Sequence, residues 1–203
     1  MLTVLICVYN DEAHIERAVR SCVEQTLDRK EYEIVIVDDG STDATPRILK
    51  ELQSTYFPFS INVMTLKENG GLGHACNEGI KKSKGRFIVR VDSDDYVNEN
   101  FLFIMSYYLL SNKEMLAVAC DYLLVDEDEN ATGRVSPIKM PIACGVMFRK
   151  DKLVEIGMYK EVRKGEDIDM FMRFVEKFAI YRIALPLYRY TQRPGSLSYQ
   201  EDK

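Results

Sequence analysis

Hydrophobic and polar positions alternate with two different periods along the first half of the chain. Nearly continuous apolar runs at residues 2–8, 34–37, 61–66 and 87–91 predict strands, because strands buried on both faces of a parallel sheet carry such runs. Apolar positions with helical spacing follow three of these runs, as in Ile15, Ala18, Val19, Cys22 and Val23. This alternation across short connections predicts an α/β domain with a mostly parallel central sheet flanked by helices.

The second half is less regular but continues without a linker. We expect strands at residues 116–125 and 142–148, an acidic turn at 126–130, and two short strands at 180–185 and 187–190. A helix beginning near Asp167 is expected to bury Ile168, Phe171, Met172 and Val175. Because no repeat or break in composition separates the halves, residues 1–203 are predicted to form one domain.

Composition narrows the classes of function. The chain has 46% hydrophobic residues and a formal net charge of −5, which argues against general nucleic-acid binding because that needs concentrated positive charge. Its five cysteines are scattered without a C-x-x-C pair, as is typical of buried apolar side chains in a reducing compartment. The first predicted strand begins near Leu2, and the densest apolar stretch, residues 101–110, is shorter than the roughly 20 residues of a membrane span. We therefore expect a soluble, cytoplasmic protein.

Two groups of carboxylates come directly after predicted strands. Asp38 and Asp39 end the second strand, and Asp92, Asp94 and Asp95 end the fourth. Ligands of open parallel sheets bind outside the carboxyl ends of the strands, so these acids are expected to converge on one site. Clustered carboxylates suit Mg²⁺ or Mn²⁺ together with substrate phosphates, and the alternate spacing of Asp92 and Asp94 places both on one side of an extended segment. For the first group, a plain turn and helix cap stays open as an alternative.

A third acidic pair, Glu166 and Asp167, begins the helix near the C-terminus. Acids at this position are favoured by the helix dipole without any catalytic meaning. They also suit a general base, which must stand apart from metal ligands so that a lone pair stays free. Arg189 and Arg193 in the polar tail are either surface charges or parts of a lid that closes on a pyrophosphate.

Six short motifs occur in one order along the chain. They are residues 7–12 (CVYNDE), 37–43 (VDDGSTD), 68–73 (ENGGLG) followed by Asn77, 92–95 (DSDD), 165–167 (GED) and 193–198 (RPGSLS). In this order they resemble glycosyltransferase family 2, whose members have the GT-A fold. The resemblance implies a single Rossmann-like GT-A domain. Within it, residues 1–98 would bind the nucleotide sugar, and residues 99–203 would carry the acceptor side, the general base and a C-terminal lid.

The resemblance also implies roles for individual residues. Asp167 would be the general base with Glu166 in support, and Asp94 would hold Mn²⁺ or Mg²⁺ together with Asp92. The residues expected to bind the donor are Val8, Tyr9, Asn10, Glu12, Asp39, Asn69, Gly71, Asp92, Ser93 and Arg193, with Asp39 on the base, commonly uracil. Cys76 stands where the family often has arginine, so one diphosphate contact is either lost or supplied by Lys67 or Arg90.

The implied activity is a metal-dependent, inverting transfer of a hexosyl or N-acetylhexosaminyl group. The donor would be a nucleotide sugar, with a UDP-sugar favoured, and the acceptor a hydroxyl of a surface polysaccharide, glycoconjugate or lipid-linked glycan. Such work is expected in the cytoplasm, with a peripheral position at the inner face of the membrane left open. One alternative is a degenerate domain that binds a nucleotide sugar without turnover. Another is a metal-dependent nucleotidyltransferase, which is disfavoured because residues 9–12 (YNDE) replace its glycine-rich basic loop.

Overall fold

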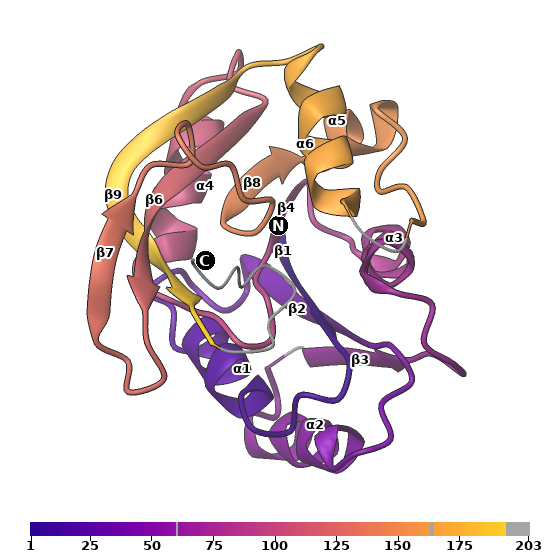
Figure 1. The fold of residues 1–203 in the computed structure, drawn as a ribbon. Coiled ribbons are helices and arrows are strands. Elements are labelled where there is room, and N and C mark those ends of the chain that lie inside the picture. The colour runs from indigo at the N-terminus through magenta and orange to yellow at the C-terminus, as the bar shows by residue number, and fades with distance from the viewer. Residues whose placement is uncertain (60, 163–164, 194–203) are drawn as a thin grey trace, which may run out of the picture.

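The first half of the chain forms four parallel strands joined by helices (Figure 1). The computed structural model describes residues 1–59, 61–162 and 165–193. The elements of this half are β1 (Leu2–Val8), α1 (Ile15–Val23), β2 (Tyr32–Asp38), α2 (Thr45–Thr55), β3 (Ile61–Thr65), α3 (Leu72–Lys82) and β4 (Phe87–Arg90). The predicted alternation of strand and helix is confirmed here, with small shifts at the strand ends.

The second half extends the same sheet. Its elements are β5 (Tyr96–Val97), α4 (Phe101–Ser111), β6 (Ala117–Val125), β7 (Ala131–Val135), β8 (Val146–Arg149), α5 (Lys150–Glu155), α6 (Glu166–Val175) and β9 (Ile180–Thr191). β8 pairs antiparallel with β4, which gives the order β3-β2-β1-β4-β8-β6-β9-β5, with β7 paired to β6. Both halves therefore belong to one α/β domain, as predicted.

Two apolar layers cover the two faces of this sheet. Val4 and Ile6 of β1 pack with apolar side chains of α1, α2 and α4, whereas Leu5 and Cys7 pack with those of α3, α5 and α6. This division follows from the pleat, because successive side chains of a strand point to opposite faces. Figure 1 shows α3, α5 and α6 grouped on one side and α1 and α2 on the other. The carboxyl ends of the parallel strands emerge between these layers.

Several elements differ from the sequence prediction. β7 was not predicted, because its sequence ATGRV lacks an apolar pattern and most of it is exposed. The strand expected at 142–148 is shorter, since Gly145 has a φ of +70° and donates its N–H to the carbonyl of Arg90. The two strands expected between 180 and 190 are one, β9, whose pairing with β6 shifts register near Pro186.

The buried face of α6 also differs from the prediction. Ile168 and Met172 were expected in the core, but they are 69% and 52% exposed. Met170 and Phe174 are fully buried instead, and Phe174 packs against the rings of Phe148 and Phe178. The helix carries two apolar stripes, one with Ile168 and Met172 and one with Met170 and Phe174. The second stripe is buried because it packs against β8.

Replacing Phe174 with alanine is expected to lower the free energy of unfolding by about 3–5 kcal/mol, the usual cost of a large cavity in a core. Met172→Ala, two residues away on the exposed stripe, is the matched control and should change stability by less than about 0.5 kcal/mol. Urea denaturation of the two variants measures both values. Equal losses would contradict the orientation of α6 described above.

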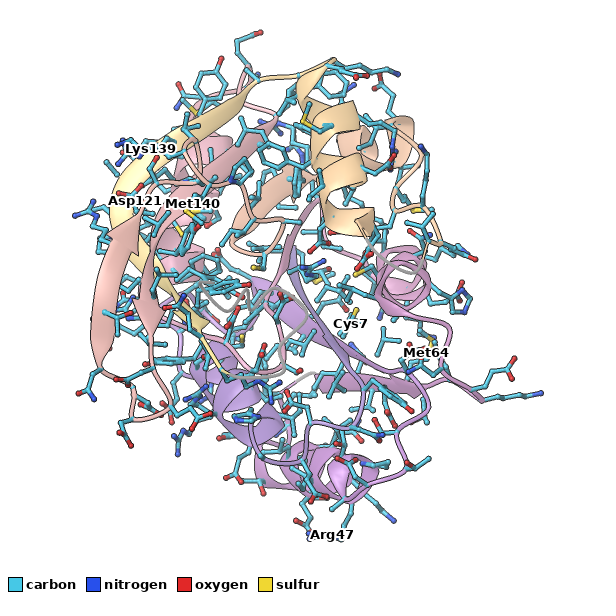
Figure 2. The ribbon with its side chains drawn as sticks, in the orientation of Figure 1. Cys7, Arg47, Met64, Asp121, Lys139 and Met140 are labelled. Carbon is cyan, nitrogen blue, oxygen red and sulfur yellow. The ribbon has the colours of Figure 1, made fainter. Side chains whose placement is uncertain are left out.

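A buried carboxylate fastens the outer strands at a distance from the carboxyl end of β1. The Asp121 side chain on β6 is 1% exposed and accepts hydrogen bonds from Arg134 on β7 and Arg182 on β9. Figure 2 shows Asp121 on the flank formed by β7 and β9, away from Cys7. The hydrogen bond from Arg182 is the main reason why the pKa of Asp121 lies below its usual range. We assign this cluster to the fold.

Within the part of the chain that the structure describes, no helix combines the length and apolar character needed to cross a bilayer.

Candidate active site

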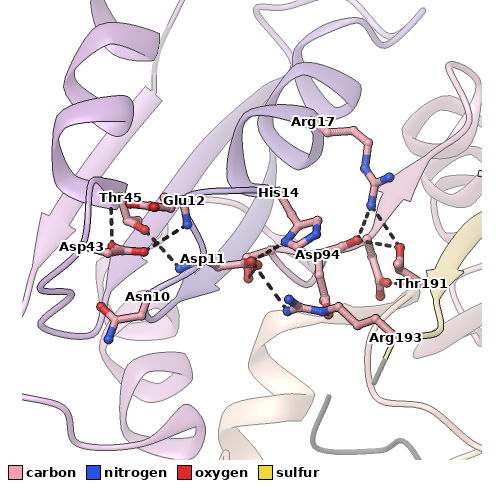
Figure 3. A network of polar contacts seen from close by, with 12 residues as sticks. Asn10, Asp11, Glu12, His14, Arg17, Asp43, Thr45, Asp94, Thr191 and Arg193 are labelled. Atoms are coloured by element: carbon pink, nitrogen blue, oxygen red, sulfur yellow. Dashed lines mark hydrogen bonds and ion pairs between the residues drawn. The ribbon is translucent and has the colours of Figure 1, made fainter. Parts of the chain in front are cut away.

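The loops after β1 and β2 are bound to each other at the carboxyl edge of the sheet (Figure 3). The Asn10 side-chain oxygen accepts from the Thr42 N–H at 2.8 Å, and Glu12 accepts from the Ala44 N–H at 2.6 Å. Asn10 itself adopts a φ of +49°, a region that asparagine tolerates better than most residues. Both side chains were predicted to bind substrate, and in the structure they hold the loop after β2. Their contact with a donor stays a prediction.

Asp39 holds the glycine loop after β3. It is 3% exposed, and its two carboxylate oxygens accept from the N–H groups of Gly70 and Gly71 at 2.9 and 2.8 Å. Asn69 accepts from the same Gly71 N–H at 3.0 Å, and Gly71 has a φ of +87°, which favours glycine. The acid predicted to read the base therefore also shapes the loop, and its contact with a base stays a prediction.

The end of β1 contributes one buried and one exposed side chain to this edge. Val8 is 2% exposed and belongs to the core, whereas Tyr9 is 47% exposed. Of these two predicted donor-binding residues, Tyr9 has the ring surface accessible for stacking. For Val8, the backbone is the group nearer to a ligand at this edge, because its side chain is covered.

The acids after β4 lie in a turn and not in an extended segment, which corrects the geometry expected from the sequence. The Asp95 N–H donates to the Asp92 carbonyl at 3.1 Å and closes the turn. Asp92 and Asp94 consequently face different partners. Asp92 accepts from Arg90, and Asp94 accepts from Arg193 at 3.1 Å.

The remaining polar groups of the turn are anchored inside the protein. Asp95 is 2% exposed and accepts from the hydroxyl of Tyr188 at 2.7 Å and the N–H of Thr191 at 2.8 Å. Ser93 donates to Asp11 at 2.6 Å, and Asp11 also contacts His14. The predicted donor-binding Ser93 thus ties the turn to the loop after β1. His14 precedes α1 and lies at this same junction.

The described residues contain one group of side chains close enough to share a metal ion, namely Asp92, Asp95 and Cys144. Two observations disfavour this particular set. Both oxygens of Asp95 already accept hydrogen bonds, and Cys144 offers a sulfur atom. Mg²⁺ and Mn²⁺ prefer oxygen ligands to sulfur.

Asp94 fits a hard divalent cation better. Its side chain is 20% exposed, and its known partner in the structure is the guanidinium of Arg193, which also lies 3.6 Å from Asp11. Mg²⁺ and Mn²⁺ accept one or two carboxylates with water and substrate phosphates completing the shell. The Asp94 carboxylate is partly exposed and already faces the positive charge of Arg193, so it could serve as one of these carboxylate ligands.

Arg90 was expected at most to replace a diphosphate contact, but the structure places its side chain between two of the predicted site acids. Its side chain is 3% exposed and donates to Asp92 and to Asp167, which lies 77 residues further along the chain. Burial lowers the pKa of Arg90, but Asp167 and Asp92 outweigh it, so the pKa stays well above its usual value. Arg90 is therefore a permanent cation between the two acids. A charged residue within an apolar strand was the signal for it.

Glu166 and Asp167 begin α6 beside this arginine. Asp167 is 31% exposed and accepts from two nitrogens of Arg90 at 2.5 and 2.7 Å. Glu166 is 7% exposed, and its Oε2 atom has no hydrogen-bond partner among the described residues. Gly165, with a φ of +82°, precedes them and turns the chain into the helix. The structure thus brings Asp92 and Asp167 together, and Glu166 lies at the same helix start.

Two thiols meet beneath the site. The sulfur atoms of Cys7 on β1 and Cys76 on α3 are 3.6 Å apart and buried. The contact with Cys76, followed by burial, raises the pKa of Cys7 well above its usual value, so Cys7 is a protonated thiol. This agrees with the expectation that the cysteines are apolar core residues. The tail motif beyond Arg193 lies outside the described residues.

The fold gathers acids at the carboxyl edge of β1, β2 and β4, where open α/β sheets bind their ligands. The sequence model of Glycosyl transferase family 2 matches residues 3–175, and the chain belongs to that family. The chain is similar to a crystal structure of Staphylococcus aureus TarS 1-349 in complex with UDP-GlcNAc, with a TM-score of 0.83 and 24% identity over 98% of this chain and 61% of that one. This likeness confirms the predicted GT-A fold.

Other relatives are similar over part of their length. The putative glycosyltransferase EpsH of Bacillus subtilis is 35% identical over 64% of this chain and 36% of its own length. The minor teichoic acid biosynthesis protein GgaB of B. subtilis is 26% identical over 99% of this chain and 24% of its own. The mannosyltransferase PcManGT of Pyrobaculum calidifontis, in complex with GDP-Man and Mn²⁺, has a TM-score of 0.80 at 19% identity, over 96% of this chain and 58% of that one. The chain thus spans about a third of the length of EpsH and about a quarter of the length of GgaB.

Proposed function

We propose that this chain is an inverting glycosyltransferase that moves a sugar from a UDP-sugar to an acceptor hydroxyl. The observation that carries the proposal is the meeting of Asp92 and Asp167 on Arg90, with Asp94 in the same turn as Asp92, in a member of glycosyl transferase family 2. Residues 1–98 bind the nucleotide sugar in this proposal, and residues 99–203 supply the base and the acceptor side. The TarS complex with UDP-GlcNAc supports UDP as the nucleotide and an N-acetylhexosaminyl or hexosyl group as the sugar.

The proposed chemistry assigns one task to each acid. Asp167 takes the proton of the acceptor hydroxyl, and attack then occurs on the face of the sugar opposite the leaving diphosphate. A carboxylate offers about four lone-pair directions, so Asp167 keeps lone pairs free while it accepts from Arg90. Asp94 would hold Mn²⁺ or Mg²⁺ together with Asp92, and the ion would supply positive charge against a leaving diphosphate. Glu166 lies next to the base and supports it.

The names of the relatives support a class of acceptor. GgaB carries a teichoic acid biosynthesis name, and TarS of S. aureus is a poly(ribitol-phosphate) beta-N-acetylglucosaminyltransferase. We infer a hydroxyl of a surface polysaccharide or a lipid-linked glycan, used at the cytoplasmic side of the membrane. The rival proposal, a degenerate binding domain, is disfavoured because Asp94 and Asp167 are both present and both partly exposed.

Calorimetric titration with UDP, GDP and dTDP, each with and without Mn²⁺, tests this proposal. We expect UDP to bind most tightly, and Mn²⁺ to strengthen its binding by about tenfold, or about 1.4 kcal/mol. Transfer from UDP-sugars to ribitol-phosphate polymers or lipid-linked glycans is then measured by release of UDP. If no nucleotide bound under any condition, the donor assignment would be wrong.

A further inference from the structure

Arg90 lies where a buried charge needs a specific reason. Along β4, Phe87 and Val89 join the core layer of α1 and α4, whereas Ile88 joins the layer of α3 and α6. The pleat directs Arg90 to the side of Ile88, and its guanidinium lies 3.9 Å from the sulfur of Cys76 on α3. Arginine is almost never fully buried unless its charge is paired. Its two partners here, Asp92 and Asp167, are both acids of the proposed reaction.

The donor capacity of Arg90 is completely used. Its guanidinium has five N–H groups in a fixed planar arrangement. Two contacts go to Asp92, from Nε at 2.7 Å and Nη2 at 3.2 Å, and two go to Asp167, from Nη1 at 2.5 Å and Nη2 at 2.7 Å. The fifth contact, from Nη1, is the one to Cys76. No N–H group is left for a diphosphate oxygen, so the expectation that Arg90 replaces a lost phosphate contact is not favoured.

The two acids reach the arginine from separate parts of the chain. Asp92 follows β4 directly, whereas Asp167 is in the first turn of α6 and depends on the packing of that helix. Their side chains are 28% and 31% exposed, while that of Arg90 is 3% exposed. The arginine therefore holds each carboxylate from its inner side and leaves the outer side open to the site.

We propose that Arg90 is a positioning residue that fixes the direction and separation of Asp167 and Asp92, and so sets the proposed base against the donor. This inference rests on the proposed function. Two carboxylates at this separation repel each other unless a cation lies between them, and a planar guanidinium also fixes their orientation. A lysine at the same position has the same charge, but its compact ammonium group cannot make two-point hydrogen bonds with both carboxylates.

The test compares Arg90→Lys with wild type for transfer and for UDP binding. We expect kcat to fall by roughly 10- to 100-fold, because misplacing a reacting group or removing its hydrogen-bonded support has effects of this size. The KM of the donor and the Kd of UDP should stay within about threefold, since Arg90 has no donor left for the nucleotide. Adding Arg90→Lys to Asp167→Asn should lower kcat by much less than Arg90→Lys does in wild type, because one of the two positioned acids is already gone.

Arg149→Lys is the matched control. Arg149 is also buried, at 5% exposure, but it donates to the backbone carbonyls of Leu109, Asn112 and Met115 at the opposite end of β4. It should alter the melting temperature and leave kcat unchanged. Should Arg90→Lys not fold, Arg90→Gln is used in the same way, and failure of both would assign Arg90 to stability alone and overturn the proposal.

Three further results would overturn it. The first is an Arg90→Lys variant with wild-type kcat. The second is a loss of UDP affinity of about tenfold in that variant, which would make Arg90 a nucleotide ligand. The third is a double variant in which Arg90→Lys lowers kcat as much as it does in wild type. In each case wild type is active, so the proposed function stands and the role of Arg90 alone fails. A wild-type chain that transfers no sugar would instead overturn the proposed function together with this inference.

Discussion

Asp167→Asn is expected to lower sugar transfer by roughly 10²- to 10⁴-fold, the usual contribution of a general base. The amide keeps the shape of the carboxylate but has no lone pair basic enough to take the proton of the acceptor hydroxyl. UDP binding should be nearly unchanged, because Asp167 contacts Arg90 and lies apart from Asp94, the proposed metal ligand. Steady-state UDP release and calorimetry on the same preparation give both values.

Asp169→Asn is the matched control for this substitution. Asp169 lies in the same first turn of α6, but its carboxylate accepts from Lys160 at 2.6 Å and Arg173 at 2.7 Å and takes no part in the site. It should transfer sugar at close to the wild-type rate. Transfer at the wild-type rate by Asp167→Asn itself would remove Asp167 as the base, and Glu166 would become the acid to test.

The strands of residues 1–98 could be predicted because each is marked by an apolar pattern within its own sequence. Each of β1, β2 and β4 is an apolar run that ends in polar residues, and burial on both faces of the sheet requires that pattern. That Asp39 and Asp92 both lie at the carboxyl edge of the sheet followed from the parallel order of the strands. These inferences needed no contact between distant residues.

The contacts that orient the site could not be predicted in this way. Arg90 interrupts an apolar strand, and the sequence shows no partner for it because Asp167 lies 77 residues away. The turn at Asp92 is held by contacts of Asp95 with Tyr188 and Thr191, far along the chain, whereas its sequence also suits an extended segment. The orientation of α6 depends on which of two apolar stripes fits against Phe148. All three are decided by tertiary packing.

The second large effect is expected at Asp94, where two cations compete for one carboxylate. In the structure Arg193 donates to Asp94 at 3.1 Å and lies near Asp11. In the proposed function the same carboxylate would hold Mn²⁺ or Mg²⁺, and a diphosphate would be the anionic partner of Arg193. Asp94→Ala should therefore bind UDP equally well with and without Mn²⁺.

Asp94→Ala should also reduce the kcat of sugar transfer by roughly 100-fold or more, because the variant would lose the metal ion that stabilises the charge of the leaving diphosphate. Calorimetry after treatment with a chelator, followed by titration of Mn²⁺, measures the effect. Asp128→Ala, in the exposed turn between β6 and β7, is the control and should keep the full response to metal. If Mn²⁺ strengthened UDP binding equally in Asp94→Ala and wild type, Asp94 would not be a metal ligand. If wild type showed no response to metal but Arg193→Ala lost UDP affinity, the guanidinium would be the cation that neutralises the diphosphate.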